Sequence, residues 1–179
     1  MHVQQGRPQP GPGPGPELGL GPEIWIRGPV ALPEEPPPSP GAFRPRRYSW
    51  VGVCGGAGVS TLASVYGGHD SGREWPGPAD PPSVLLVART HAAGLTAALN
   101  ALEVFRRGEA PHGLDLDAVV LVADAPGRLP RPLADRVKVI ESVIDVYRVP
   151  WVPSWRLGDL NGQPPRETEA LARLTGRSR

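Results

Sequence analysis

The sequence has a single cysteine and no long apolar run, and each shortage excludes a class of protein. Cys54 is the only cysteine among 179 residues, so an intrachain disulfide is impossible and a cysteine-based zinc cluster is not expected. No apolar stretch approaches the roughly 20 residues that span a bilayer. The N-terminus lacks the basic start and apolar core of a signal peptide. We therefore expect a soluble, cytoplasmic protein without a membrane span.

Strong charge of one sign is also absent. The formal net charge is +1, so the chain shows no strong signal for binding nucleic acid. Lys138 is the only lysine, and all the other basic residues that make up the total of 19 are arginine. Together with abundant Ala, Gly and Pro, this usage is typical of a high-GC bacterial genome and has no bearing on chemistry.

Proline and glycine are plentiful and are concentrated at the start of the chain. Residues 1–46 hold 13 of the 25 prolines and 8 of the 23 glycines. A segment with so few apolar side chains cannot offset the entropy of ordering it, so we expect a disordered tail over 1–46. A short apolar island at 23–32 interrupts it, as an edge strand or a patch on the domain. The tail is either a docking arm for a protein partner or a tail without function.

The globular part alternates strand and helix patterns four times from residue 47. Runs such as Val84–Ala88 are apolar throughout, which is typical of parallel strands covered on both faces. The pattern predicts an α/β fold, with a three-layer, mostly parallel sheet over 47–162 and a C-terminal helix and tail over 163–179. We expect strands at 48–53, 84–88, 118–122 and 146–149, helices at 60–66, 91–107, 132–144 and 166–175, a loop at 67–83 and irregular chain at 151–162.

A glycine turn follows the first predicted strand and precedes the first predicted helix. Glycines let backbone N–H groups curl around an anion, and the helix N-terminus adds partial positive charge. The P-loop pattern for this purpose is G-x-x-x-x-G-K-[ST]. Gly58 matches its second glycine and Ser60 its hydroxyl, but Val53 stands at the first glycine and Val59 at the lysine.

The segment Cys54–Thr61 resembles the K-G-G-x-G-K-[ST]-T loop of the MinD/ParA-like P-loop ATPases. In that alignment Cys54 and Val59 replace both lysines. Three other segments resemble the same family: Val84–Arg89 its strand before the sliding helix, Val119–Asp124 the strand ending near its base-recognition loop, and Arg148–Trp151 its late hydrophobic-Pro-aromatic turn. The family's switch strands and acidic magnesium partner have no counterpart before Val84, so the resemblance implies a truncated P-loop NTPase-like fold.

The chain is also similar to an uncharacterised family of high-GC, actinobacterial-type proteins. The shared segments are a Trp-x-x-Gly-Pro-Val-like island, the glycine loop, an Ala-Asp-Ala-Pro-Gly-Arg-Leu-Pro-Arg-Pro-Leu segment and a Pro-Trp-x-x-x-Trp-Arg-Leu-Gly segment. This similarity implies that loss of the lysine is a family trait, and it supplies no function.

A phosphate ligand is the only one that these residues predict. The glycine loop is either a tight structural turn without a ligand or a site that binds ATP, ADP or another phosphate compound weakly, and we expect no catalytic residue and no metal site. Arg89 and Asp124 are included because ligands enter such sheets at the carboxyl ends of the strands. Trp151, Trp155 and Arg156 form either a surface for a protein partner or a lid over the core. The candidate ligand-binding residues are Gly55, Gly56, Ala57, Gly58, Val59, Ser60, Thr61, Arg89 and Asp124.

The leading hypothesis is a non-catalytic P-loop-like protein, or pseudo-ATPase, that acts as an interaction or regulatory module. The loss of a positioned cation removes an effect worth orders of magnitude in phosphoryl transfer. Two alternatives stay open. One is an active or nucleotide-sensing MinD/ParA-like ATPase that borrows a cation, such as Arg89 or one from a partner subunit. The other is an adaptor for a secretion, conjugation or partition machinery.

Overall fold

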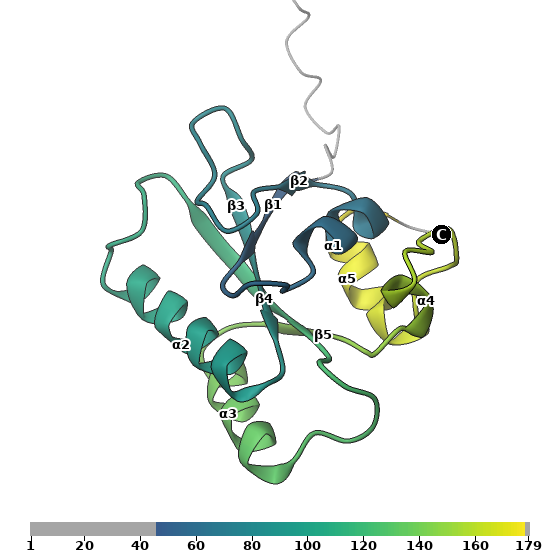
Figure 1. The fold of residues 1–179 in the computed structure, drawn as a ribbon. Coiled ribbons are helices and arrows are strands. Elements are labelled where there is room, and N and C mark those ends of the chain that lie inside the picture. Colours follow the sequence, from purple (N-terminus) through teal and green to yellow (C-terminus); the bar gives the residue numbers. More distant parts are fainter. Residues whose placement is uncertain (1–45, 178–179) are drawn as a thin grey trace, which may run out of the picture. The chain divides into compact units, whose positions relative to one another are not determined.

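The structure is a computed structural model and describes residues 46–177. The predicted tail over 1–46, apart from Arg46, and its apolar island at 23–32 lie outside the described residues. Strands and helices alternate along the chain as the sequence predicts (Figure 1). None of the helices within 46–177 is both long and apolar enough to cross a bilayer. The elements are β1 Tyr48–Gly52, α1 Val59–Tyr66, β2 His69–Asp70, β3 Ser83–Arg89, α2 Ala92–Arg106, β4 Asp115–Val122, α3 Arg131–Glu141, β5 Val146–Val149, α4 Pro153–Arg156, the 3-10 helix η1 Arg166–Thr168, and α5 Glu169–Leu174.

The five strands form one sheet in the order β2-β1-β3-β4-β5, and every pairing is parallel. The chain passes from β1 to β2 on one side and then crosses back over β1 to reach β3. The direction of winding therefore reverses between β1 and β3. In doubly wound sheets, ligands bind outside the carboxyl ends of the strands at this reversal. The glycine turn after β1 lies at that point.

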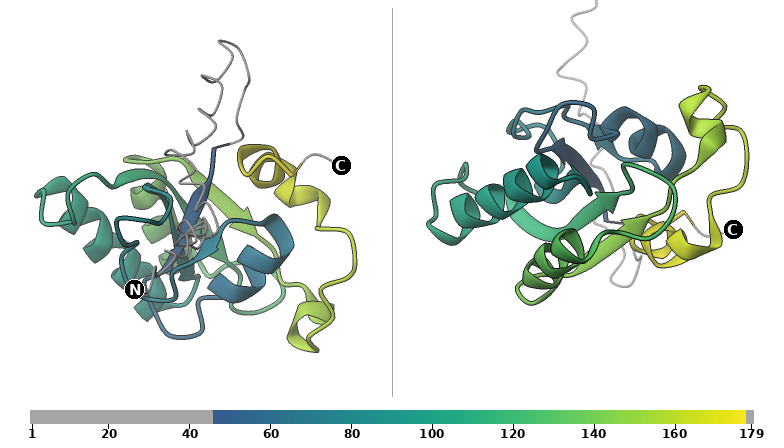
Figure 2. Two further views of the ribbon diagram at one scale, coloured as in Figure 1. Left: turned by 90° about the horizontal axis from the view of Figure 1, so that it is seen from above. Right: turned by 60° about the horizontal axis from the view of Figure 1, so that its bottom comes forward.

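Helices cover both faces of the sheet, which gives the three layers expected from the sequence (Figure 2). Alternate residues of each strand serve opposite faces. Trp50, Leu85 and Val120 pack with Leu62 of α1, whereas Leu86 and Val119 belong to the core on the other face. That other core includes Leu95 of α2 and Ile140 of α3. Because β3 is buried on both sides, its apolar run needs no alternation.

The C-terminal segment closes the core on the α1 face. Leu171 of α5 is buried among the residues beneath α1. The buried hydroxyl of Tyr66, at the end of α1, donates to Thr168 Oγ1 at 2.6 Å. Burial raises the pKa of Tyr66, and its hydrogen bond with Thr168 acts in the opposite direction. Residues 166–174 thereby hold the helix that follows the glycine turn.

The start of α2 fits tightly against the end of β3. His91 caps the helix, because its Nδ1 accepts a hydrogen bond from the backbone N–H of Gly94 at 3.0 Å. Gly94 lies so close to β3 that an added Cβ would be 2.3 Å from the carbonyl oxygen of Arg89. This close contact with α2 restricts the position of the Arg89 backbone.

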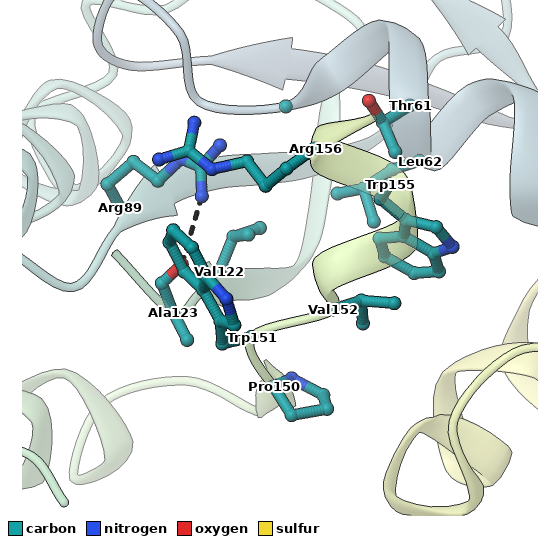
Figure 3. A pocket seen from close by; sticks show the side chains of 11 residues that line it. Thr61, Leu62, Arg89, Val122, Ala123, Pro150, Trp151, Val152, Trp155 and Arg156 are labelled. Carbon is teal, nitrogen blue, oxygen red and sulfur yellow. Dashed lines mark hydrogen bonds between the residues drawn. The ribbon is translucent and has the colours of Figure 1, made fainter. Parts of the chain in front are cut away.

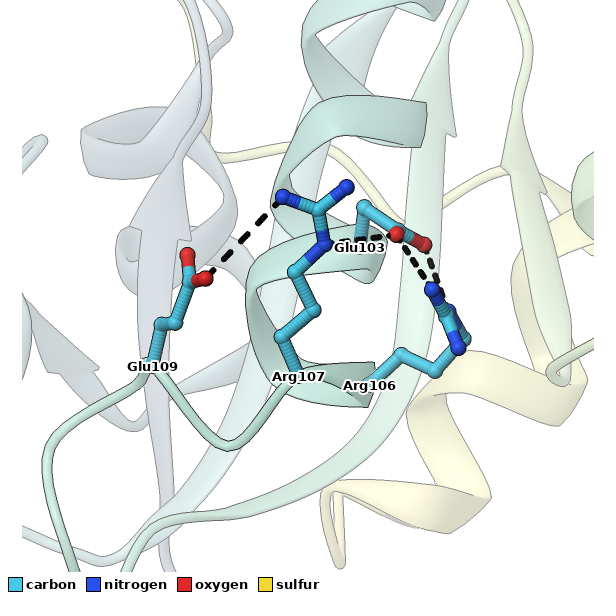
Figure 4. Close-up of polar contacts among 4 residues, drawn as sticks. All are labelled: Glu103, Arg106, Arg107 and Glu109. Atoms are coloured by element: carbon cyan, nitrogen blue, oxygen red, sulfur yellow. Dashed lines mark hydrogen bonds and ion pairs between the residues drawn. The ribbon is translucent and has the colours of Figure 1, made fainter.

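The other end of α2 carries an exposed group of ion pairs (Figure 4). Glu103 accepts hydrogen bonds from Arg106 and Arg107, and Arg107 also lies 4.0 Å from Glu109. The hydrogen bond from Arg106, followed by that from Arg107, lowers the pKa of Glu103 to about 2. Cations at a helix C-terminus also interact favourably with its dipole.

Three parts of the predicted layout are corrected. The expected loop at 67–83 contains β2, a strand of two residues that is too short to produce a hydrophobic pattern. The expected irregular segment 151–162 contains α4, a single turn that Pro153 begins. The expected final helix at 166–175 is divided into η1 and α5.

Replacing Gly94 with alanine should destabilise the protein although alanine is the better helix former. In an open helix site this change gains up to about 1 kcal/mol. Here the added Cβ meets backbone that cannot rotate away, so we expect a loss of about 1–3 kcal/mol in the free energy of unfolding. Urea denaturation measures it.

Gly162→Ala is the matched control, because nothing lies within 4 Å of its added Cβ. Its free energy of unfolding should stay close to that of the wild type. A Gly94→Ala protein as stable as this control would contradict the close approach of α2 to β3.

Candidate phosphate-binding site

The candidate site begins with the turn that joins β1 to α1. Within residues 46–177, the backbone N–H groups of 54–61 donate to no hydrogen-bond acceptor. The first N–H of this region that is paired belongs to Leu62, which donates to Gly58 O at 2.9 Å. Consecutive free N–H groups at a helix N-terminus are the arrangement that binds anions.

The side chains of the turn divide between the core and the surface. Ala57 and Val59 are buried in the core beneath α1, and Gly58 has a φ of 101°, which side-chain-bearing residues rarely adopt. Ser60 is exposed, whereas Thr61 lines the cavity next to the turn. The position of the P-loop lysine is thus filled by an apolar side chain that packs inward. The hydroxyl residue that lines the cavity is Thr61 and not Ser60, which the motif favoured.

Arg89, the last residue of β3, ties two loops to the end of the sheet. Its Nε donates to Gly56 O and its Nη1 to Ala123 O, each at 2.9 Å. Its Nη2 lies 4.0 Å from the point where Gly58 would carry a Cβ. Burial lowers the pKa of Arg89, the nearby charge of Arg156 lowers it further, and Asp124 acts in the opposite direction. Two guanidinium groups therefore interact unfavourably at this position.

Arg156 reaches the same place from α4. Its guanidinium carbon lies 4.5 Å from the centre of the Trp151 ring, a cation–π contact. Neither Arg89 nor Arg156 forms an ion pair with a carboxylate of residues 46–177. Figure 3 shows both arginines and Trp151 on one side of the cavity and Thr61 on another. The cavity has a volume of about 50 Å³, and it is lined by Gly58, Thr61, Leu62, Arg89, Val122, Ala123, Pro150, Trp151, Val152, Trp155 and Arg156.

Trp155 closes the core beside this cavity. Its ring meets the ring of Tyr66 edge-on, with 6.5 Å between the centres, and packs against the buried cluster under α1. Trp155 thus both packs on the core and lines the cavity, whereas Trp151 and Arg156 line the cavity and do not belong to the core cluster.

Asp124 lies in a second hollow and not among the cavity residues. This groove of about 1010 Å³ runs between α3 and β5, and it shares Ala123 and Pro150 with the cavity. The backbone N–H of Asp124 donates to Thr90 Oγ1 at 3.1 Å. Of the predicted site residues, the structure places Gly58, Thr61 and Arg89 together at the cavity and Asp124 in the neighbouring groove.

Asp70 lies at the same end of the sheet as the glycine turn, and no pattern in the sequence indicated this. Asp70 ends β2, next to β1, and its Oδ1 accepts from the N–H of Gly72 at 2.8 Å. Gly72 in turn accepts from the N–H of Gly52, the last residue before the glycine turn. Within the described residues, no three His, Cys, Asp or Glu side chains are grouped as a metal site requires.

The fold and the site define a doubly wound α/β protein with a glycine turn and two arginines at the point where the winding reverses. The chain belongs to a family of unknown function, DUF6668, whose family model matches residues 48–173. Neither a curated protein nor a solved structure matches it. The resemblance to MinD/ParA-like ATPases stays a prediction.

Arg89→Met should loosen the glycine turn. The variant loses both hydrogen bonds to backbone carbonyls, and we expect the free energy of unfolding to fall by about 1–2 kcal/mol. Hydrogen–deuterium exchange should become faster at the two hydrogen-bonded amides that flank the turn, those of Val53 and Leu62, because Gly56 O loses its tether.

Arg156→Met is the control, since the Arg156 guanidinium rests on the Trp151 ring and donates no hydrogen bond to the glycine turn. It should cost less than about 1 kcal/mol. Unchanged exchange of the Val53 and Leu62 amides in Arg89→Met would show that Arg89 does not order the turn.

Proposed function

We propose that this chain is a non-catalytic, P-loop-like module that binds a phosphate-bearing ligand at its glycine turn and acts in regulation or in recruitment of a protein partner. The observation that carries the proposal is the set of free N–H groups over 54–61, next to a cavity with two arginines that have no carboxylate partner within 46–177. Amides and guanidinium groups both favour phosphate oxygens.

The side chains around the turn favour binding over hydrolysis. Phosphoryl transfer depends on cations placed against the transferred group. Val59 cannot provide one, because valine carries no charge. Its side chain also packs inward against Gly52, where an added Cβ would lie 2.9 Å from Val59 Cγ2. Two of the three side-chain nitrogens of Arg89 already donate hydrogen bonds to backbone carbonyls. A site of this kind holds a ligand in place and leaves its phosphate intact.

An ATPase that uses Arg89 as a replacement cation is the alternative. The observation in its favour is Arg89 Nη2, which lies beside Gly58 and has no acceptor among residues 46–177. Cytoplasmic location and the adaptor role suggested by the proline-rich arm remain expectations from the sequence.

Gly58→Ala should abolish ligand binding. Any side chain at φ 101° strains the turn and rotates its N–H groups away from a common anion. Isothermal titration calorimetry with phosphate, ADP and ATP measures the binding, and phosphate release from ATP measures hydrolysis. We expect weak binding by the wild type and no hydrolysis above the buffer.

Gly113→Ala is the matched control. Gly113 also has positive φ, 85°, and an added Cβ meets nothing within 4 Å. It suffers the same kind of backbone strain far from the glycine turn, so it should lose stability and keep binding. ATP hydrolysis at ordinary enzymatic rates that Gly58→Ala abolishes would favour the ATPase and refute the module.

A further inference from the structure

We propose that the cavity binds the dianion of a phosphate monoester, or of inorganic phosphate, without a metal ion. This inference rests on the proposed function and narrows its ligand from phosphate compounds in general to a single terminal phosphoryl group.

Charge is the first reason. Arg89 and Arg156 are the only charged side chains that line the cavity, and both are cations. They share one small space with the start of α1, whose dipole contributes about half a positive charge. A phosphoryl group carrying about two negative charges matches this total. A singly charged phosphodiester leaves one guanidinium unmatched.

The mutual repulsion of the arginines is the second reason. Burial and the facing charge of Arg156 both lower the pKa of Arg89, and the charge of Asp124 acts in the opposite direction. Within 46–177 no carboxylate reaches either guanidinium. An oxyanion between the two groups turns a repulsive pair into two charge-assisted contacts.

Size is the third reason. The cavity has a volume of about 50 Å³, and roughly 10–15 Å³ by the same measure already holds one water molecule. Sites that enclose a whole drug-sized ligand hold about 300–1,000 Å³. A space for a few water molecules has room for one phosphoryl group, and the rest of a larger ligand lies outside it. The wider groove, which shares Ala123 and Pro150 with the cavity, is adjacent.

The lining also argues for binding without magnesium. Magnesium is held by carboxylates, waters and phosphate oxygens. The cavity lining contains no carboxylate, and Thr61 Oγ1 is its only side-chain oxygen. A divalent cation there would add to two positive charges that already neutralise the phosphoryl group. Magnesium should therefore compete with the protein for the ligand.

The test is calorimetry on the full chain with inorganic phosphate, AMP, sulfate and ATP, each with and without MgCl2. AMP and inorganic phosphate distinguish an esterified from a free phosphate. We expect AMP or phosphate to bind at least as tightly as ATP, and MgCl2 to leave that binding unchanged or weaker. Arg156→Gln should weaken it at least about tenfold. Arg131→Gln, an exposed arginine outside both hollows, should not.

Acidity supplies a second readout. The second pKa of a phosphate monoester is about 6, so lowering the pH from 7.5 to 5 removes most of the dianion and should weaken AMP about tenfold. Sulfate stays dianionic and should lose no affinity. Asp124 and Cys54 lie near Arg89 whichever anion is bound, so sulfate also controls for any effect of pH on the protein itself.

The outcomes separate the two proposals. ATP binding that needs MgCl2 and is much tighter than AMP or phosphate overturns this inference and leaves the proposed function standing. Equal weakening of AMP and sulfate at low pH, or full binding by Arg156→Gln, also overturns it. No binding by any of the four anions refutes the proposed function as well.

Discussion

Arg89 connects the parts from which the site is made. It ends the central strand of the sheet, and it donates to one carbonyl of the glycine turn and to another in the loop after β4. Its own backbone cannot shift, because Gly94 of α2 packs directly on it. The turn, the third strand and the loop at Ala123 therefore keep one geometry. The remaining nitrogen, Nη2, is directed toward Gly58, and an anion bound there meets a cation that is already positioned.

The second cation is held in a different way. Arg156 lies on a single helical turn, rests on the ring of Trp151 and has no hydrogen bond to the described chain that fixes its guanidinium. A contact of this kind contributes roughly 0.5–1 kcal/mol at an exposed site, which leaves the side chain free to exchange an aromatic face for an anion. Behind it, Trp155 and Tyr66 keep the segment against the core. One arginine organises the turn, and the other responds to the ligand.

Sequence patterns predicted the elements that have a clear apolar pattern, and they missed the elements that have none. The strands at 84–88 and 118–122 were confirmed because a buried parallel strand is apolar throughout, and the sheet proved to be entirely parallel. The two residues of β2 depend on pairing with β1, which no local pattern encodes. In the site, the glycine motif located the turn, and a position at the carboxyl end of a strand indicated Arg89. The motif could not show that Thr61 rather than Ser60 lines the cavity, or that α4 returns Arg156 to the same place.

The central claim is that the free amides of the glycine turn and its two arginines form one anion site. A titration of ¹⁵N-labelled protein with inorganic phosphate, followed by two-dimensional ¹H–¹⁵N NMR, tests it most directly. The account predicts saturable shifts confined to the backbone amides of 54–61, to the Nε–H signals of Arg89 and Arg156, and to the indole signal of Trp151. Shifts centred elsewhere, or an unperturbed turn at saturating phosphate, would contradict it.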